Sequence, residues 1–162
     1  MQNAKDTFYE VLRTRLASVN PARTAVVRGQ VRPAVVVEEN ELSTMALPLE
    51  CFRLRWLGAS VDANGALARV TMECEIYYET AGSAEVAGMD RGRVLAAMDA
   101  ELCAIAESPL RSAVKTSFAK SATLDTNVWW SGVTLGAEKS VGDCVSRTAT
   151  VSVMSYQKAG EL

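Results

Sequence analysis

The sequence predicts an α+β fold, a mainly antiparallel sheet of long hairpins with two helices packed on one face. Two segments, 3–19 and 94–105, repeat apolar residues at the three-and-four spacing of a helix. Two others, 49–60 and 67–80, alternate apolar and polar residues as strands do, and turn residues separate them. With 162 residues, 49% of them hydrophobic, the chain can build one core, so residues 1–162 are expected to form a single domain.

The first part of the chain predicts a helix and a hairpin. The helix covers Asn3–Val19 and ends at Asn20-Pro21, because proline cannot continue the helical hydrogen bonds. Strands Thr24–Arg28 and Val31–Glu38 follow, joined by Gly29-Gln30. Pro33 lacks an N–H group, so the second strand lies at a sheet edge or begins after Pro33. Residues 39–44 are expected to form a polar loop.

The clearest pattern is the alternation within Leu49–Ser60 and Leu67–Thr80, which extends over twelve consecutive positions from 68 to 79. The turn residues 62–65 join these runs into a long hairpin with one buried face and one charged, wet face. The charged face carries Arg53, Arg55, Glu73, Glu75 and Glu79. We expect the two arginines to sit across from Glu73 and Glu75, an arrangement that suits a solvated face or a protein interface better than paired-carboxylate hydrolysis.

The second half predicts a loop, a helix and two strands. Residues 81–92 are expected to form the loop, and the helix Val94–Ile105 ends near Ser108-Pro109. The basic segment 111–121 has no clear pattern and is compatible with a continued helix. Val128–Leu135 and Cys144–Tyr156 are the last strands, which gives the order α-β-β-β-β-α-β-β.

The absence of histidine is the strongest constraint on function, because histidine supplies most general bases near neutral pH and is the commonest metal ligand. The cysteines include no closely spaced pair, so we expect scattered reduced thiols in a cytosolic setting rather than a zinc site; they are Cys51, Cys74, Cys103 and Cys144. The sequence also has no glycine-rich phosphate-binding motif. We therefore expect no enzymatic activity, no cofactor and no metal.

Two motif matches are formal only. Ser112–Lys115 and Ser117–Lys120 have the serine–lysine spacing of penicillin-recognising enzymes, but the other elements of that site are missing, so a basic surface segment is expected. Residues 62–65 resemble the start of a calcium loop with the glycine misplaced, which fits a hairpin turn.

The charge balance argues against two classes of partner. A formal net charge of -2 provides no overall field to attract nucleic acid or anionic lipid. Local basic residues would give weak, salt-sensitive contacts at most; they are Arg91, Arg93, Arg111, Lys115 and Lys120. No uncharged apolar run approaches the roughly 20 residues of a membrane span, and the first residues do not resemble a signal peptide. We expect a soluble protein without a membrane or nucleic-acid partner.

Trp129 and Trp130 are adjacent, so in a strand their side chains point to opposite faces. Either both faces are covered and both rings are in a core, or one ring contacts a subunit or partner. Base stacking is disfavoured because no arginine or lysine lies between them.

The arrangement of these segments resembles the tail-terminator or tail-completion proteins of tailed bacteriophages and prophages. The resemblance covers most of the chain and rests on the following segments: the helix Phe8–Leu16, the strand Arg32–Glu38, the charged strand Glu73–Glu79, the helix Val94–Ile105 and the closing strand Arg147–Val153. It implies a non-enzymatic structural subunit, located in the virion tail and in the host cytoplasm during assembly. Such subunits form a homo-oligomeric ring, typically sixfold, that ends the tail tube and joins it to the head–tail connector.

The resemblance also implies that the long hairpin extends towards a neighbouring subunit. By that analogy, the candidate subunit interface consists of Arg53, Arg55, Glu73, Glu75 and Glu79. The alternative from another class is a small-ligand-binding or regulatory α+β domain, with a pocket between the helix Val94–Ile105 and the sheet.

Overall fold

The computed structural model describes residues 1–41, 48–107, 110–117, 119–158 and 160–161. They form an α+β structure, as predicted. The helices are α1 (Gln2–Val19), α2 (Glu38–Glu41) and α3 (Arg91–Ala106), with a short 3₁₀ turn, η1 (Ala84–Val86). The strands are β1 (Thr24–Val27), β2 (Gln30–Pro33), β3 (Val35–Val37), β4 (Phe52–Asp62), β5 (Ala68–Thr80), β6 (Ser112–Ser117), β7 (Ala122–Trp130), β8 (Thr134–Leu135), β9 (Lys139–Val141) and β10 (Cys144–Gln157).

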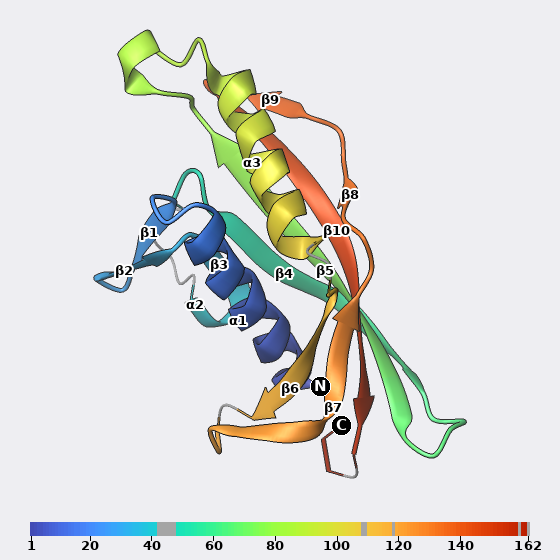
Figure 1. The fold of residues 1–162 in the computed structure, drawn as a ribbon. Helices are drawn as coiled ribbons and strands as arrows, with labels where there is room; N and C mark the ends of the chain where they lie inside the picture. Colours follow the sequence, from blue (N-terminus) through green and yellow to red (C-terminus); the bar gives the residue numbers. More distant parts are fainter. Residues whose placement is uncertain (42–47, 108–109, 118, 159, 162) are drawn as a thin grey trace.

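The main sheet has the order β3-β4-β5-β10-β7-β6 and is antiparallel except for the parallel pair β3–β4 (Figure 1). Strands β5 and β10 form its centre and stay paired from Val145 opposite Thr80 to Gln157 opposite Ala68. The strands β7, β8 and β9 follow one another along the other side of β10. The alternation that predicted β5 is therefore explained by its position: it is an interior strand with one face in the core.

Helices α1 and α3 lie on the same face of the sheet (Figure 1). Both helices bury their apolar stripes there completely, through Phe8, Leu12 and Leu16 of α1 and Leu95, Met98, Leu102 and Ile105 of α3. They meet the buried side chains of β5 and β10, and together these residues form the hydrophobic core. Burial of apolar surface at about 25 cal/mol per Å² is what holds the two layers together.

The first hairpin is shorter than predicted. Strand β2 ends at Pro33, and β1 and β2 form a separate two-stranded sheet. The chain then turns at Ala34, whose N–H donates to the Arg23 carbonyl, and β3 joins the main sheet beside β4. The range Val31–Glu38 is therefore divided at Pro33, which cannot donate to a continued ladder, and the strand of the main sheet begins after it, as one of the two predicted alternatives has it. The predicted loop also begins as a helical turn, α2, and its residues 42–44 lie outside the described residues.

The basic segment 111–121 contains strand β6, so its continuation as a helix was a wrong prediction. Strand β6 pairs with β7, and its register shifts between Val114 and Thr116. The predicted strand Val128–Leu135 is also divided, because β7 begins earlier and ends at Trp130, while β8 begins at Thr134.

The sheet face opposite the two helices, here called the outer face, carries the polar residues of the central strands. Within the described residues no helix lies on it (Figure 1). Its members on β5 and β10 are Arg69, Thr71, Glu73, Glu75, Tyr77, Glu79, Ser146, Thr148, Thr150, Ser152, Met154 and Tyr156, as the register shows. This face contains the five candidate interface residues.

Candidate subunit interface

Arg55 and Glu75 form the pair that the sequence predicts on the outer face. They are directly opposite each other on β4 and β5, and the Arg55 Nη2 atom lies 2.9 Å from Glu75 Oε1. The Arg55 side chain is 54% exposed, so solvent screens the pair and its contribution to stability is small. Its charge and hydrogen-bonding groups are accessible to another subunit.

Arg53 is placed differently from the prediction. It lies opposite Tyr77, not Glu73 or Glu75, and only 6% of its surface is exposed. Its guanidinium group stacks 4.2 Å from the centre of the Tyr77 ring and lies 3.5 Å from Glu79. Tyr77 in turn donates to Glu79 Oε2 over 2.8 Å. These three side chains pack against one another. Arg53 is therefore a buried part of the sheet and contributes little to its exposed surface.

Glu73 is exposed and has no arginine opposite it. It faces Gly58 on β4, after an irregularity in register between Trp56 and Gly58, and the Ser152 hydroxyl lies 2.7 Å and 2.9 Å from its two carboxylate oxygens. Among the described residues, none forms an ion pair with Glu73, in contrast to Glu75 and Glu79. Glu73 therefore retains an accessible negative charge on the outer face.

The β4–β5 hairpin extends away from the body of the molecule (Figure 1). Strand β3 pairs with β4 only from Phe52 to Leu54, so in the described part of the chain the rest of that β4 edge has no neighbouring strand. Three apolar side chains are exposed here: Leu57 by 54%, Val61 by 50% and Leu67 by 39%. Open strand edges and clustered exposed apolar residues are typical of surfaces that bind another chain.

The adjacent tryptophans divide between the two faces. Trp130 is buried in the core, with its ring centre 5.3 Å from that of Phe8 and its Nε1–H donating to the Ala106 carbonyl. Trp129 lies opposite Met154 on the outer face, where its ring meets Tyr156 edge to face. The outer face thus has an apolar area beside its polar rows.

Helix α3 is fixed to the sheet where the alternative hypothesis placed a ligand pocket. The Tyr78 hydroxyl donates to Asp99 Oδ1 over 2.5 Å, and Arg147 Nε donates to the same oxygen over 2.9 Å. Burial, followed by the hydrogen bond to Asp99, raises the pKa of Tyr78. Because the apolar stripe of α3 is fully buried, this contact is packed by side chains.

Two hollows of the surface lie elsewhere. One, of about 440 Å³, is bounded by the first residues of α1 and the irregular part of β4, with Lys5 5.2 Å above the Trp56 ring. The other, of about 280 Å³, runs between α1 and β6 and includes Val11, Ala113 and Val114. Both hollows are open to solvent and are not enclosed cavities.

The cysteines are free thiols, and the first serine–lysine pattern lies on strand β6. All four cysteines are free, and burial raises the pKa of Cys51 to about 12 and also raises that of Cys74. No three cysteine, aspartate or glutamate side chains converge as metal ligands in the described ranges. Ser112 and Lys115 are both on β6, three positions apart, where neighbouring side chains alternate in direction.

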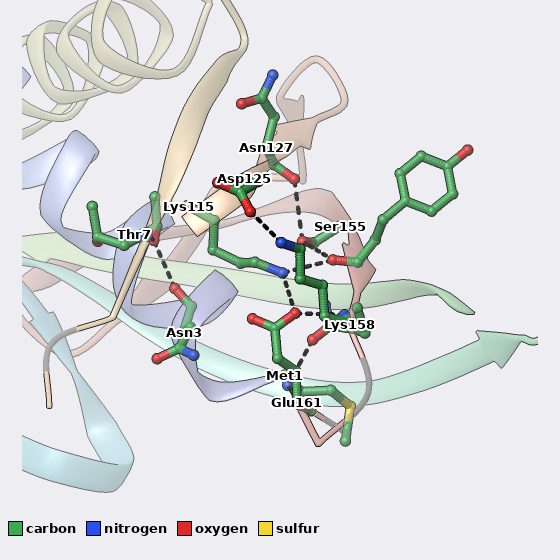
Figure 2. A network of polar contacts seen from close by, with 12 residues as sticks. Met1, Asn3, Thr7, Lys115, Asp125, Asn127, Ser155, Lys158 and Glu161 are labelled. Carbon is green, nitrogen blue, oxygen red and sulfur yellow. Dashed lines mark hydrogen bonds and ion pairs between the residues drawn. The ribbon is translucent and has the colours of Figure 1, made fainter. Parts of the chain in front are cut away.

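Lys115 is the residue whose place sequence reasoning missed. It was expected in a basic surface segment, but its side chain is 0% exposed and belongs to a polar network with Glu161 (Figure 2). The register shift around Lys115 places its side chain in this buried network. No pattern in the sequence predicts that shift.

None of the described helices has the length and apolarity needed to cross a bilayer. Comparison with known protein families and with curated proteins found no match to this chain.

Proposed function

We propose that this chain is a structural subunit of a homo-oligomeric ring, the tail terminator of a tailed bacteriophage or prophage. In this proposal the ring is a hexamer, as the resemblance implies, which ends the tail tube and provides the surface for the head–tail connector proteins. The subunit acts by binding other proteins and performs no catalytic step. It is made in the host cytoplasm and becomes part of the virion tail.

The observation that carries the proposal is the projecting β4–β5 hairpin. Its exposed Leu57, Val61 and Leu67 and its open β4 edge are left without a cover by the described part of the chain. A ring is built from heterologous contacts, in which one patch of each subunit meets a different patch of the next. A hairpin that projects from one side of the molecule is suited to such a contact.

The outer face supports the same function. Glu73 supplies an accessible charge, and Arg55 is exposed beside it on the neighbouring strand. The polar rows of β5 and β10 offer hydrogen-bonding groups along the length of both strands. Charged and polar residues of this kind fix the orientation of a partner more than they add affinity. The small-ligand alternative has less support, because α3 and the sheet are closely packed.

The test is association of the purified protein after changes in the hairpin. Sedimentation velocity of the double variant Leu57→Glu/Val61→Glu should show loss of the assembled species, with an unchanged circular dichroism spectrum. Val26→Glu is the matched control, since Val26 is 66% exposed on the separate β1–β2 sheet. Equal assembly of the double variant and the wild type would contradict the role of the hairpin.

A further inference from the structure

The central sheet divides at its lower end, beyond the three residue pairs that join β10 to β7. These pairs run from Val153 opposite Trp130 to Ser155 opposite Val128. Past them β10 continues beside β5, while β7 continues beside β6 and curves away (Figure 1). Beyond Ser155 no pair joins β10 to β7 in the described residues, and the Ser155 hydroxyl lies 3.1 Å from the Tyr156 carbonyl oxygen.

Lys115 fills this split. Its Nζ atom lies 2.6 Å from the Tyr156 carbonyl oxygen, and its side chain is completely buried. Helix α1 holds β6 at this irregular position. The Thr116 N–H donates to Thr7 Oγ1 over 3.0 Å, and the Thr7 hydroxyl donates to the Asn3 carbonyl (Figure 2). The lysine is therefore held in place by the fold and not by its ion pair alone.

The counter-charge comes from the residues that follow β10. Glu161 Oε2 lies 2.9 Å from Lys115 Nζ and accepts a second hydrogen bond, over 2.6 Å, from the Lys158 backbone N–H. A buried ammonium group is costly unless a carboxylate or other acceptors neutralise it. In the described residues Glu161 is the one acid that forms an ion pair with Lys115.

Only one of the two Glu161 carboxylate oxygens has hydrogen-bond partners among the described residues. Its other carboxylate oxygen, Oε1, is buried and has no hydrogen-bond partner among the described residues. The short segment that carries Glu161 has few other attachments: an ion pair of Lys158 with the exposed Asp125, and a contact of the Glu161 carbonyl with the Met1 amino group. Among the described residues, the contact with Lys115 is the one by which the Glu161 carboxylate reaches the buried part of the fold.

We propose that the split between β10 and β7 is a carboxylate-binding site, with the Lys115 ammonium as receptor and Glu161 as its tethered, replaceable occupant. The ligand class is a monocarboxylate group small enough to take the position of the Glu161 side chain. When such a group occupies the site in place of Glu161, the ion pair that joins Glu161 to Lys115 is lost. This proposal is independent of the ring-forming role.

Chemical rescue tests the site directly. Glu161→Ala removes the side chain beyond Cβ, and acetate has the size of the removed group. We expect the variant to have a lower Tm than the wild type, and acetate at pH 7 to raise it in a saturable manner, while equal ionic strength of sodium chloride does not. The double variant Lys115→Met/Glu161→Ala should not respond to acetate.

Hydrogen exchange provides a second readout that does not require an empty site. In Glu161→Gln the backbone amides of residues 156–158 should exchange about tenfold faster than in the wild type, which corresponds to about 1.4 kcal/mol. The matched control is Asp125→Asn, which removes the exposed ion pair of the same segment and should leave the exchange nearly unchanged. The site assignment is overturned if acetate stabilises all variants equally, or if Glu161→Gln exchanges at the wild-type rate.

Discussion

At the scale of single residues, position in the sheet decides what a charge contributes. Arg53 and Arg55 are two positions apart on one strand and have the same chemistry, yet Arg53 is stacked on Tyr77 and Arg55 is exposed. Removing a buried guanidinium group costs the protein packing contacts as well as a charge, whereas removing an exposed one costs little stability.

Arg53→Ala should lower the free energy of unfolding by about 1–3 kcal/mol, because it removes the stack on Tyr77 and leaves Glu79 without its cation. Arg55→Ala, the matched control, should cost less than about 0.5 kcal/mol. Urea denaturation followed by tryptophan fluorescence measures both. Equal losses for the two variants would show that Arg53 is not packed as described.

The Glu161 carboxylate should give the contact with Lys115 a dependence on pH. Burial alone would raise the pKa of Glu161, but the hydrogen bond from Lys158 and the Lys115 ammonium outweigh it and hold the pKa below its ordinary value of 4.5. A lowered folded-state pKa means that the stabilisation is fully present above pH 4.5 and is lost as the pH falls through the lower value. The Met1 amino group is a further positive charge that acts on this carboxylate.

The measurement is exchange of the amides at 156–158, corrected for the intrinsic pH dependence of exchange, between pH 6 and pH 3. Protection should decrease below pH 4.5 in the wild type and stay flat in Glu161→Gln. A decrease of the same size in both proteins would assign the transition to another group.

At the scale of elements, the loop between β5 and α3 is a rigid excursion. Asp90 accepts hydrogen bonds from the Ser83 N–H and hydroxyl, both over 2.8 Å, and so closes the loop at its base. Gly88 has a φ of +75°, and a Cβ atom there would lie 2.6 Å from the Ala81 carbonyl oxygen. Both the backbone angle and the space require glycine at this position.

Gly88→Ala should therefore destabilise the protein by about 1–3 kcal/mol. Gly58→Ala is the control, because its backbone is extended and nothing lies within 4 Å of an added Cβ atom. Thermal unfolding compares the two variants with the wild type. A tolerated Gly88→Ala, with unchanged Tm, would mean that the loop rearranges more easily than its contacts indicate.

The elements also show which features can be predicted from sequence. The β5 alternation is readable because each inward residue, such as Met72 or Ile76, meets the core. The residue opposite Arg53 could not be predicted from the sequence. It depends on the register of β4 against β5, which the pattern of neither strand determines. Strand β6 was hidden for another reason: its buried position is filled by Lys115, whose partner lies 46 residues away.

At the scale of the whole molecule, one sheet face forms the core and the other remains open, and a hairpin projects from the body (Figure 1). The helices bury most of their apolar residues in the core, so the outer face, the hairpin and smaller exposed patches are the main surfaces left for association. The hollows of its surface, of about 280 to 440 Å³, are open to solvent. This distribution of surfaces favours a protein that binds other proteins over one that encloses a ligand.

The most direct test of the ring-forming role is the mass of the wild-type protein in solution. Light scattering across a concentration series, with and without magnesium, should give one assembled species of fixed stoichiometry, and negative-stain images should show closed rings. A mass equal to the 17.4 kDa monomer at every concentration would contradict the proposed ring.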